Sequence, residues 1–365
     1  MISDETLSRK HIQNVASALK ASDERVVERA LRALVVLDRL ADSALRFVFK
    51  GGTSLLMHLP APKRLSVDVD MFCDQPAELF EDVLGEEVCK GLFGEFRLEK
   101  RGAYSQPKRR HYRIPYVSVI SSEEDYILID VVEDPCPILD VEEKPLDMSF
   151  LKIEGSPTMV TLPKVSALLA DKLTAFAPHT IGVKFKTRSG LGHEHQVMKQ
   201  FVDIAQLYEY GFSISELRRN YEAVAEAEIT YRDTMLTPED ALRDTMRTSF
   251  DVSCLNIPRR QFAERDILLS GVSKVRGDLI HGALLNTETI PIMAGRVAYL
   301  AALLMSGAWV VEQFPGVHEV RNDLYNVKFL PPLKLIEKMR RAHPEAFWYW
   351  AKIHELLPAW MPEIV

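Results

Sequence analysis

Two glycines and two aspartates in one short segment constrain this chain more than any other feature. The segment, FVFKGGTSLLMHLPAPKRLSVDVDMFC, spans residues 47–73. Gly51 and Gly52 interrupt one apolar run, and Asp68 and Asp70 stand two residues apart inside a second run. Neighbouring carboxylates in apolar surroundings repel each other and lose hydration, so a fold that places them there needs a compensating cation.

The second run, residues 65–72, predicts a β-strand whose side chains alternate between two faces. Ser66, Asp68 and Asp70 then share one face, and the two carboxylates can bind the same divalent ion. Mg²⁺, or Mn²⁺, suits such a pair because it accepts one or two carboxylates and keeps positions for phosphate oxygens. The simpler alternative is that both aspartates decorate a solvated strand.

A later run, YILIDVVE at residues 126–133, repeats this pattern, with Asp130 among β-branched and aliphatic residues. If its strand lies beside the Asp-x-Asp strand in one sheet, Asp130 supplies a third carboxylate to the same site. We therefore predict Asp68, Asp70 and Asp130 as catalytic metal ligands.

The glycine pair follows a predicted strand at Phe47–Lys50 and precedes a predicted helix at residues 53–59. Small residues at this position let a phosphate approach backbone N–H groups at a helix start, and Thr53 or Ser54 can add a hydroxyl. An ordinary strand-to-helix turn is the alternative. Together with Ser-x-Asp-x-Asp, the pair favours metal-assisted phosphoryl transfer, with Ser66 as a further nucleotide contact.

The rest of the chain divides into regions of different periodicity. Residues 23–45 predict a helix from their apolar spacing, and the sequence after residue 163 is almost entirely helical in pattern. We expect an α+β protein with three parts: a helical segment at 1–45, a core with a mixed sheet flanked by helices at 46–155, and a mostly α-helical C-terminal domain at 156–365.

Composition limits the class of partner. The formal net charge is −7 and the isoelectric point about 5.9, so only local basic clusters can hold a nucleic acid. The candidate RNA-binding residues form two such clusters, Lys108, Arg109 and Arg110, and Lys184, Lys186 and Arg188. Four scattered cysteines and a polar N-terminus predict a cytoplasmic protein, and the apolar run at 297–311 predicts a buried helix, not a membrane contact.

These motifs resemble a known family. The order strand, glycine pair, helix, Asp-x-Asp strand and later Asp strand resembles the nucleotidyltransferase fold shared with DNA polymerase beta. More narrowly, FKGGTSL, RLSVDVDMF and ILIDVV are similar to the toxins of AbiEii/AbiGii-type toxin–antitoxin systems, including the MenT-like toxins.

The resemblance extends into the helical half. Ala170-Asp171-Lys172-Leu173 matches an A-x-K-L motif, and Lys172 falls within the apolar stripe of its helix. A family motif K-D-x-x-D-L aligns with residues 199–204, where Gln200 and Ile204 depart from it and Asp203 is retained. The resemblance implies that Lys172 neutralises a triphosphate across the domain interface and that Asp203 acts near the acceptor hydroxyl. A snorkelling lysine and a surface Lys199–Asp203 ion pair are the alternatives.

The resemblance implies a Mg²⁺-dependent transfer of a nucleotide from an NTP to an acceptor hydroxyl, with the tRNA 3′ end as the expected acceptor and a cognate antitoxin as partner. Growth would stop because the modified tRNA cannot be aminoacylated. Three alternatives stay open: transfer to a protein or small molecule, a two-metal nuclease, and a non-enzymatic RNA- or partner-binding protein.

Overall fold

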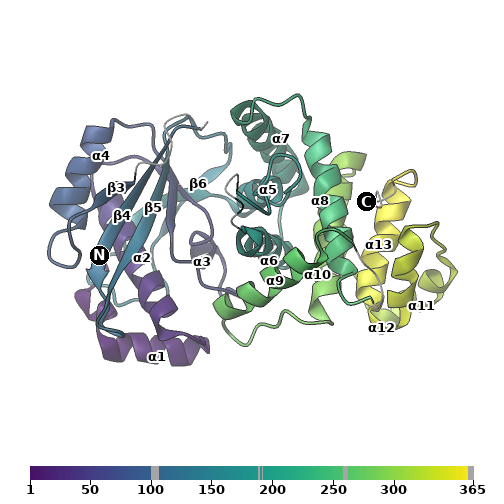
Figure 1. The fold of residues 1–365 in the computed structure, drawn as a ribbon, viewed down its shortest axis with the longest axis horizontal. Coiled ribbons are helices and arrows are strands. Elements are labelled where there is room, and N and C mark those ends of the chain that lie inside the picture. Colours follow the sequence, from purple (N-terminus) through teal and green to yellow (C-terminus); the bar gives the residue numbers. More distant parts are fainter. Residues whose placement is uncertain (100–106, 188–189, 191, 258–261, 361–365) are drawn as a thin grey trace. The chain divides into compact units, whose positions relative to one another are not determined.

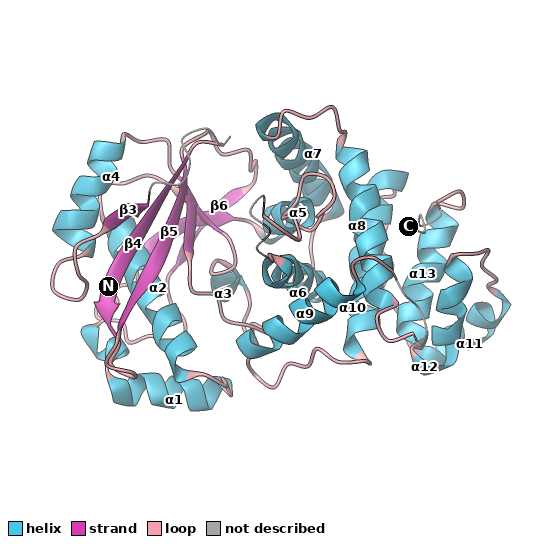
Figure 2. Cartoon of the chain, in the orientation of Figure 1, coloured by secondary structure: helices cyan, strands magenta, loops and turns pink. Residues whose placement is uncertain are grey.

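The computed structural model describes residues 1–99, 107–187, 190, 192–257 and 262–360, and the chain forms two compact units (Figure 1). The first, here called the sheet unit, comprises Met1–Lys164 and Gly277–Ala283. The second, the helical unit, comprises Val165–Arg276 and Leu284–Val365. Figure 2 shows the corresponding change from mixed strands and helices to helices.

Within its described residues, the sheet unit contains a five-stranded sheet of order β1-β2-β5-β4-β3 and a two-stranded sheet of β6 and β7. Strands β2 and β5 are parallel, and the other neighbouring pairs are antiparallel. The predicted α+β class with a mixed sheet is therefore confirmed. The strands are β1 (Val48–Lys50), β2 (Val69–Phe72), β3 (Arg97–Glu99), β4 (Arg109–Val117), β5 (Glu124–Val132), β6 (Val141–Pro145) and β7 (Met159–Pro163).

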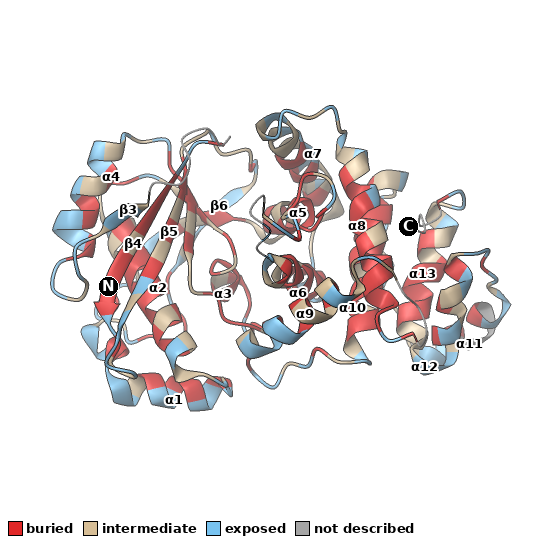
Figure 3. Cartoon of the chain, viewed as in Figure 1, coloured by how far each residue is buried: buried red, intermediate tan, exposed pale blue. Residues whose placement is uncertain are grey.

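The helices of the sheet unit bury the apolar face of the larger sheet. Helix α2 (Glu24–Asp42) carries the predicted apolar stripe and begins at Asp23, whose side chain accepts from the Arg25 N–H. Its buried residues join Val69, Met71 and Ile129 of the strands in one core (Figure 3). The remaining helices here are η1 (Asp4–Leu7), α1 (Arg9–Leu19), α3 (Leu55–His58), α4 (Ala77–Val83) and η2 (Leu84–Val88).

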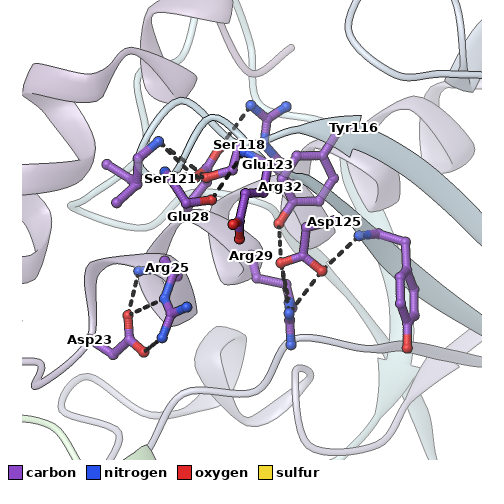
Figure 4. A network of polar contacts seen from close by, with 12 residues as sticks. Asp23, Arg25, Glu28, Arg29, Arg32, Tyr116, Ser118, Ser121, Glu123 and Asp125 are labelled. Atoms are coloured by element: carbon purple, nitrogen blue, oxygen red, sulfur yellow. Dashed lines mark hydrogen bonds and ion pairs between the residues drawn. The ribbon is translucent and has the colours of Figure 1, made fainter.

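A buried network of polar contacts links α2 to the β4–β5 hairpin (Figure 4). The Glu28 carboxylate pairs with Arg32 at 2.9 Å and accepts from the Ser118 hydroxyl at 2.6 Å and the Val119 N–H at 3.0 Å. The Arg32 guanidinium also lies over the Tyr116 ring, 4.1 Å from its centroid. Both charges are almost fully buried, yet each meets its partners, as burial of charge requires.

A short segment of the C-terminal half belongs to the sheet unit. Leu65 donates its N–H to the Asp278 carbonyl at 3.1 Å, and Ile280 donates to the Lys63 carbonyl at 2.9 Å. Ile280 is buried in the sheet-unit core. The expected three-part division assigns this segment to the C-terminal domain. It sets the boundary between the core and that domain at residue 155, between β6 and β7. No local sequence pattern indicates that a segment so far along the chain packs back onto the sheet unit.

The helical unit is built from α5 (Val165–Ala175), α6 (Glu194–Tyr210), α7 (Ile214–Tyr231), α8 (Pro238–Ser253), α9 (Arg265–Val275), α10 (Thr289–Ser306), α11 (Val317–Asn326), η4 (Leu333–Lys338), α12 (Met339–Ala342) and α13 (Pro344–Leu356), and η3 (Arg276–Asp278) leads back to the sheet unit. Helix α10 is long and apolar enough to cross a membrane, but 72% of it is buried inside the protein. That burial agrees with the predicted core helix.

Three of the strands lack a strong sequence pattern. Strands β3 and β6 are short and charged, and β7 lies at the expected start of the helical region, so none has a strong apolar alternation. Strand β2 begins at Val69, later than the predicted residue 65, and residues 63–65 pair with the returning segment at 278–280.

Candidate active site

The glycine turn is shaped by the side chains packed against it. Gly51 has φ +78°, and a methyl group there would overlap the Asp70 carboxylate. A methyl group at Gly52 would lie 2.6 Å from both the Arg64 guanidinium and the Ser66 hydroxyl. The two glycines therefore let charged and polar groups of the following segment approach the backbone closely.

The two hydroxyls predicted to bind phosphate are buried and hold this turn together. Thr53 donates to the Asp68 carbonyl at 2.6 Å, and Ser54 donates to the Gly51 carbonyl at 2.8 Å. Both residues have 0% exposure. Their donor protons are thus used within the turn in this structure, and a phosphate contact by either hydroxyl stays a prediction.

The Asp-x-Asp strand and the later Asp strand are direct neighbours, as the third-carboxylate hypothesis requires. In the parallel register of β2 and β5, Asp70 pairs with Asp130. Paired residues of adjacent strands project from the same face, which places two anions side by side. Asp68 precedes β2 and is half-buried.

The antiparallel register of β4 and β5 brings His111 of β4 opposite Asp130. Its Nδ1 contacts the Asp130 Oδ1, and only 11% of the His111 side chain and 24% of the Asp130 side chain are exposed. The sequence pattern gives His111 no link to the acids, because only the pairing of β4 with β5 brings it to the Asp130 carboxylate.

Arg64 is a second residue that the sequence analysis missed. It is buried beside Gly52 and donates from Nη1 to the Leu65 carbonyl at 3.0 Å. Its position in KRLSVDVD offered a signal, since residues 64, 66, 68 and 70 share the alternation that selected the acids. A buried guanidinium beside a glycine turn is chemically suited to bind phosphate.

In the helical unit, Lys172 of α5 and Asp203 of α6 form an ion pair, with Nζ 3.2 Å from Oδ2. The side chains are 4% and 0% exposed. Lys172 therefore lies on the buried side of its helix, and Asp203 is not a surface residue. Their predicted roles toward the triphosphate and the acceptor stay predictions.

The comparisons with known proteins give one decisive match. The family described as nucleotidyl transferase AbiEii toxin, type IV toxin–antitoxin system, matches residues 33–265. The chain belongs to the AbiEii family. This assignment confirms the resemblance and makes the protein a nucleotidyltransferase-family toxin, with an NTP substrate and an antitoxin partner implied at family level.

Solved structures show weaker likeness to this AbiEii protein. A putative nucleotidyltransferase from H. pylori is 16% identical over 80% of this chain and 100% of its own, with a TM-score of 0.44. MenT4, a nucleotidyltransferase toxin from Mycobacterium tuberculosis H37Rv, is 15% identical over 93% and 98%, with a TM-score of 0.49. Among curated proteins, none matches. The assignment rests on the family match alone.

A divalent metal is implied by the AbiEii family, and the residues present fit it. Asp70 and Asp130 face the same way from paired positions and offer the hard oxygen ligands that Mg²⁺ prefers. Within the described residues no group of three His, Cys, Asp or Glu side chains is gathered closely enough to hold a metal alone. A two-carboxylate site, with substrate phosphate oxygens completing the shell, agrees with both observations.

The basic clusters of this AbiEii protein are only partly available to RNA. Lys108 and Arg109 are exposed, and so are Lys184 and Lys186. The structure corrects the prediction that Arg110 is exposed. Arg110 is buried, pairs with Glu133 and donates to the Gln75 carbonyl at 3.2 Å. Alternation along β4 turns its side chain to the core face. Arg188 lies outside the described residues.

A cavity of about 530 Å³ also occurs in the sheet unit, at the far end of β2. Phe72, Cys73 and Asp74 line it together with residues of β1, β6 and β7. No residue predicted as a site residue lines this cavity, so it is not the site of the paired acids.

Proposed function

We propose that this protein is a metal-dependent nucleotidyltransferase toxin that transfers a nucleoside monophosphate from an NTP to the 3′ end of tRNA. The observation that carries the proposal is the pairing of Asp70 with Asp130 beside the Gly51–Gly52 turn. Membership of the AbiEii family supports the reaction class. The acceptor, the cytoplasmic location and the resulting block of translation are part of the proposal.

The protein's own residues have distinct tasks in this reaction. Asp70 and Asp130 would hold the divalent ion, which when bound supplies charge stabilisation for the phosphates. Asp68 stays a predicted ligand only, because the described residues gather no group of three such side chains closely enough to hold a metal. Gly51, Gly52, Ser66 and Arg64 would bind and orient the distal phosphates.

The bond changes are those of a nucleotidyl transfer. The acceptor hydroxyl oxygen forms a bond to the α-phosphorus, and the bond between the α-phosphorus and the bridging oxygen breaks. Pyrophosphate leaves with the bond electrons, and the hydroxyl proton passes to a base or to solvent. Lys108, Arg109, Lys184 and Lys186 are the exposed cations proposed to contact RNA phosphates.

The test uses the full chain with total tRNA, Mg²⁺ and each α-labelled NTP in turn. We expect label to enter tRNA from one NTP and to fall at least ~10³-fold in Asp70→Ala. Asp147→Ala, which removes an exposed carboxylate of the same unit, is the matched control and should keep full activity. Periodate-oxidised tRNA, whose terminal ribose hydroxyls are destroyed, should accept no label.

Other outcomes would each contradict one part of the proposal. Label in oxidised tRNA contradicts the 3′-end acceptor. Label only in protein or small molecules identifies another acceptor for the same chemistry. Shortened RNA without incorporated label assigns the acids to a nuclease, and RNA binding that is unaffected by Asp70→Ala, without any reaction, contradicts an enzymatic role.

A further inference from the structure

One row of ionisable side chains crosses the entire larger sheet. Its members come one from each strand and pair successively in the observed register: Lys50 of β1, Asp70 of β2, Asp130 of β5, His111 of β4 and Glu99 of β3. Paired positions project from a common face, so all five side chains belong to the face opposite the α2 core. Within this row, His111 directly contacts Asp130, a proposed metal ligand.

The chemistry of the two groups fixes which of them donates the hydrogen bond. A carboxylate has no proton to donate, so the His111 Nδ1–H donates to the Asp130 Oδ1. A carboxylate has two oxygens, and a hydrogen bond that occupies Oδ1 turns Oδ2 toward other ligands. The contact therefore selects one orientation of Asp130 and one oxygen for the ion.

The backbone around His111 is itself held rigidly. On one side Arg110 is buried and pairs with Glu133, and on the other Tyr112 is fully buried with its hydroxyl 3.1 Å from a Glu81 oxygen. These neighbours point to the core face, so His111 must point to the face of the acids. An anchored strand limits the freedom of the imidazole before any ligand binds.

We propose that His111 is a positioning residue that orients Asp130 for divalent-metal binding. This inference rests on the proposed function, because it needs a metal at the paired acids. Groups that hydrogen-bond metal ligands commonly change metal affinity 10–100-fold when they are removed.

The decisive experiment measures Mn²⁺ binding to the full chain by the electron paramagnetic resonance signal of free Mn²⁺, without turnover. The variants are His111→Ala, His111→Asn and His111→Gln. An Asn side-chain amide nitrogen lies near the position of Nδ1, whereas that of Gln reaches toward Nε2, so only Asn keeps the donor in place. His11→Ala, which removes an imidazole bonded to the Phe150 carbonyl at 2.8 Å, is the control for loss of a histidine contact in the same unit.

We expect His111→Ala and His111→Gln to weaken Mn²⁺ binding about 10-fold or more, and His111→Asn and His11→Ala to stay within about 3-fold of the parent. Thermal unfolding with and without Mn²⁺ should show the same order of metal-induced stabilisation, which separates metal binding from a general loss of stability.

Two results would overturn the inference: unchanged Mn²⁺ affinity in folded His111→Ala, or equal loss in the Asn and Ala variants. If His111→Ala does not fold, the comparison of Asn with Gln decides alone. Asp130→Ala distinguishes the two levels of the argument. Unchanged Mn²⁺ binding in that variant defeats the proposed metal site itself, whereas a loss there without a loss in His111→Ala defeats only the role of His111.

Discussion

Charged side chains have different neighbours on the two faces of the larger sheet. On the α2 face, Glu28 and Arg32 are almost fully buried and are saturated by each other and by donors of the β4–β5 hairpin (Figure 4). On the other face, Asp70 and Asp130 stand side by side as like charges. The first arrangement completes the fold, whereas the second sets two like charges in paired register positions, an arrangement that a divalent cation would stabilise and that is typical of a site.

The largest expected difference between the faces is in stability. Glu28→Gln leaves Arg32 buried without its partner charge and should lower the free energy of unfolding by about 4 kcal/mol. Asp70→Asn, at a half-buried position, should change it by less than about 1 kcal/mol while abolishing nucleotidyl transfer. Chemical denaturation of both variants measures this, and an equal loss of stability would show that Asp70 is also structural.

The Lys172–Asp203 pair of the helical unit extends the comparison to a second buried pair. Lys172→Met removes the cation that pairs with the buried Asp203 carboxylate and should cost about 3 kcal/mol of stability. The double variant Lys172→Met/Asp203→Leu should regain most of that loss, because apolar packing can replace a buried pair. Denaturation and transfer assays on both variants separate two roles. A stable, inactive double variant supports the predicted catalytic role, and a stable, active one refutes it.

His58 offers a pH test of the turn region. Burial, followed by the nearby Lys144 ammonium, lowers the pKa of His58 to about 4, and its Nε2 donates to the Pro163 carbonyl at 2.8 Å. Because the folded pKa lies below the unfolded value of about 6.5, unfolding takes up a proton and stability falls as pH drops from 6.5 toward 4. About 1.5 kcal/mol should be lost between pH 6.5 and 5.

His58→Gln should flatten this dependence, since the amide does not titrate. Denaturation at a series of pH values gives the slope for each protein. An unchanged slope in the variant would place the proton uptake at other groups.

The smallest expected change in stability comes from alanine substitutions at two glycines of similar backbone geometry. Gly51 has φ +78° and Gly155 has φ +73°, so an alanine at either position costs about 1 kcal/mol in backbone strain. Only at Gly51 does the added methyl meet another group, the Asp70 carboxylate. Gly51→Ala should therefore lose further stability and metal affinity, whereas Gly155→Ala should keep wild-type transfer. Equal behaviour of the two variants would contradict the close approach of Asp70.

Periodicity allowed much of the sheet unit to be predicted. The apolar stripe of α2 and the aliphatic strand β5 have patterns strong enough to identify alone, and the alternation that puts Ser66, Asp68 and Asp70 on one face stays a prediction, because only Asp70 lies within β2. Arg64 belongs to that same alternation and was overlooked. The run of basic residues at 108–110 predicts one exposed cluster, which is wrong for Arg110 because a strand sends neighbouring side chains to opposite faces.

Residue types and their spacing indicate the kind of chemistry without coordinates: a glycine turn, an Asp-x-Asp motif and a later aspartate. Which of these groups meet depends on the tertiary structure. The parallel register pairs Asp70 with Asp130, the antiparallel register brings His111 to Asp130, and helix packing joins Lys172 to Asp203. Strand register and helix packing depend on contacts between residues far apart in the chain, and a local pattern carries no information on which partner a strand or helix will choose.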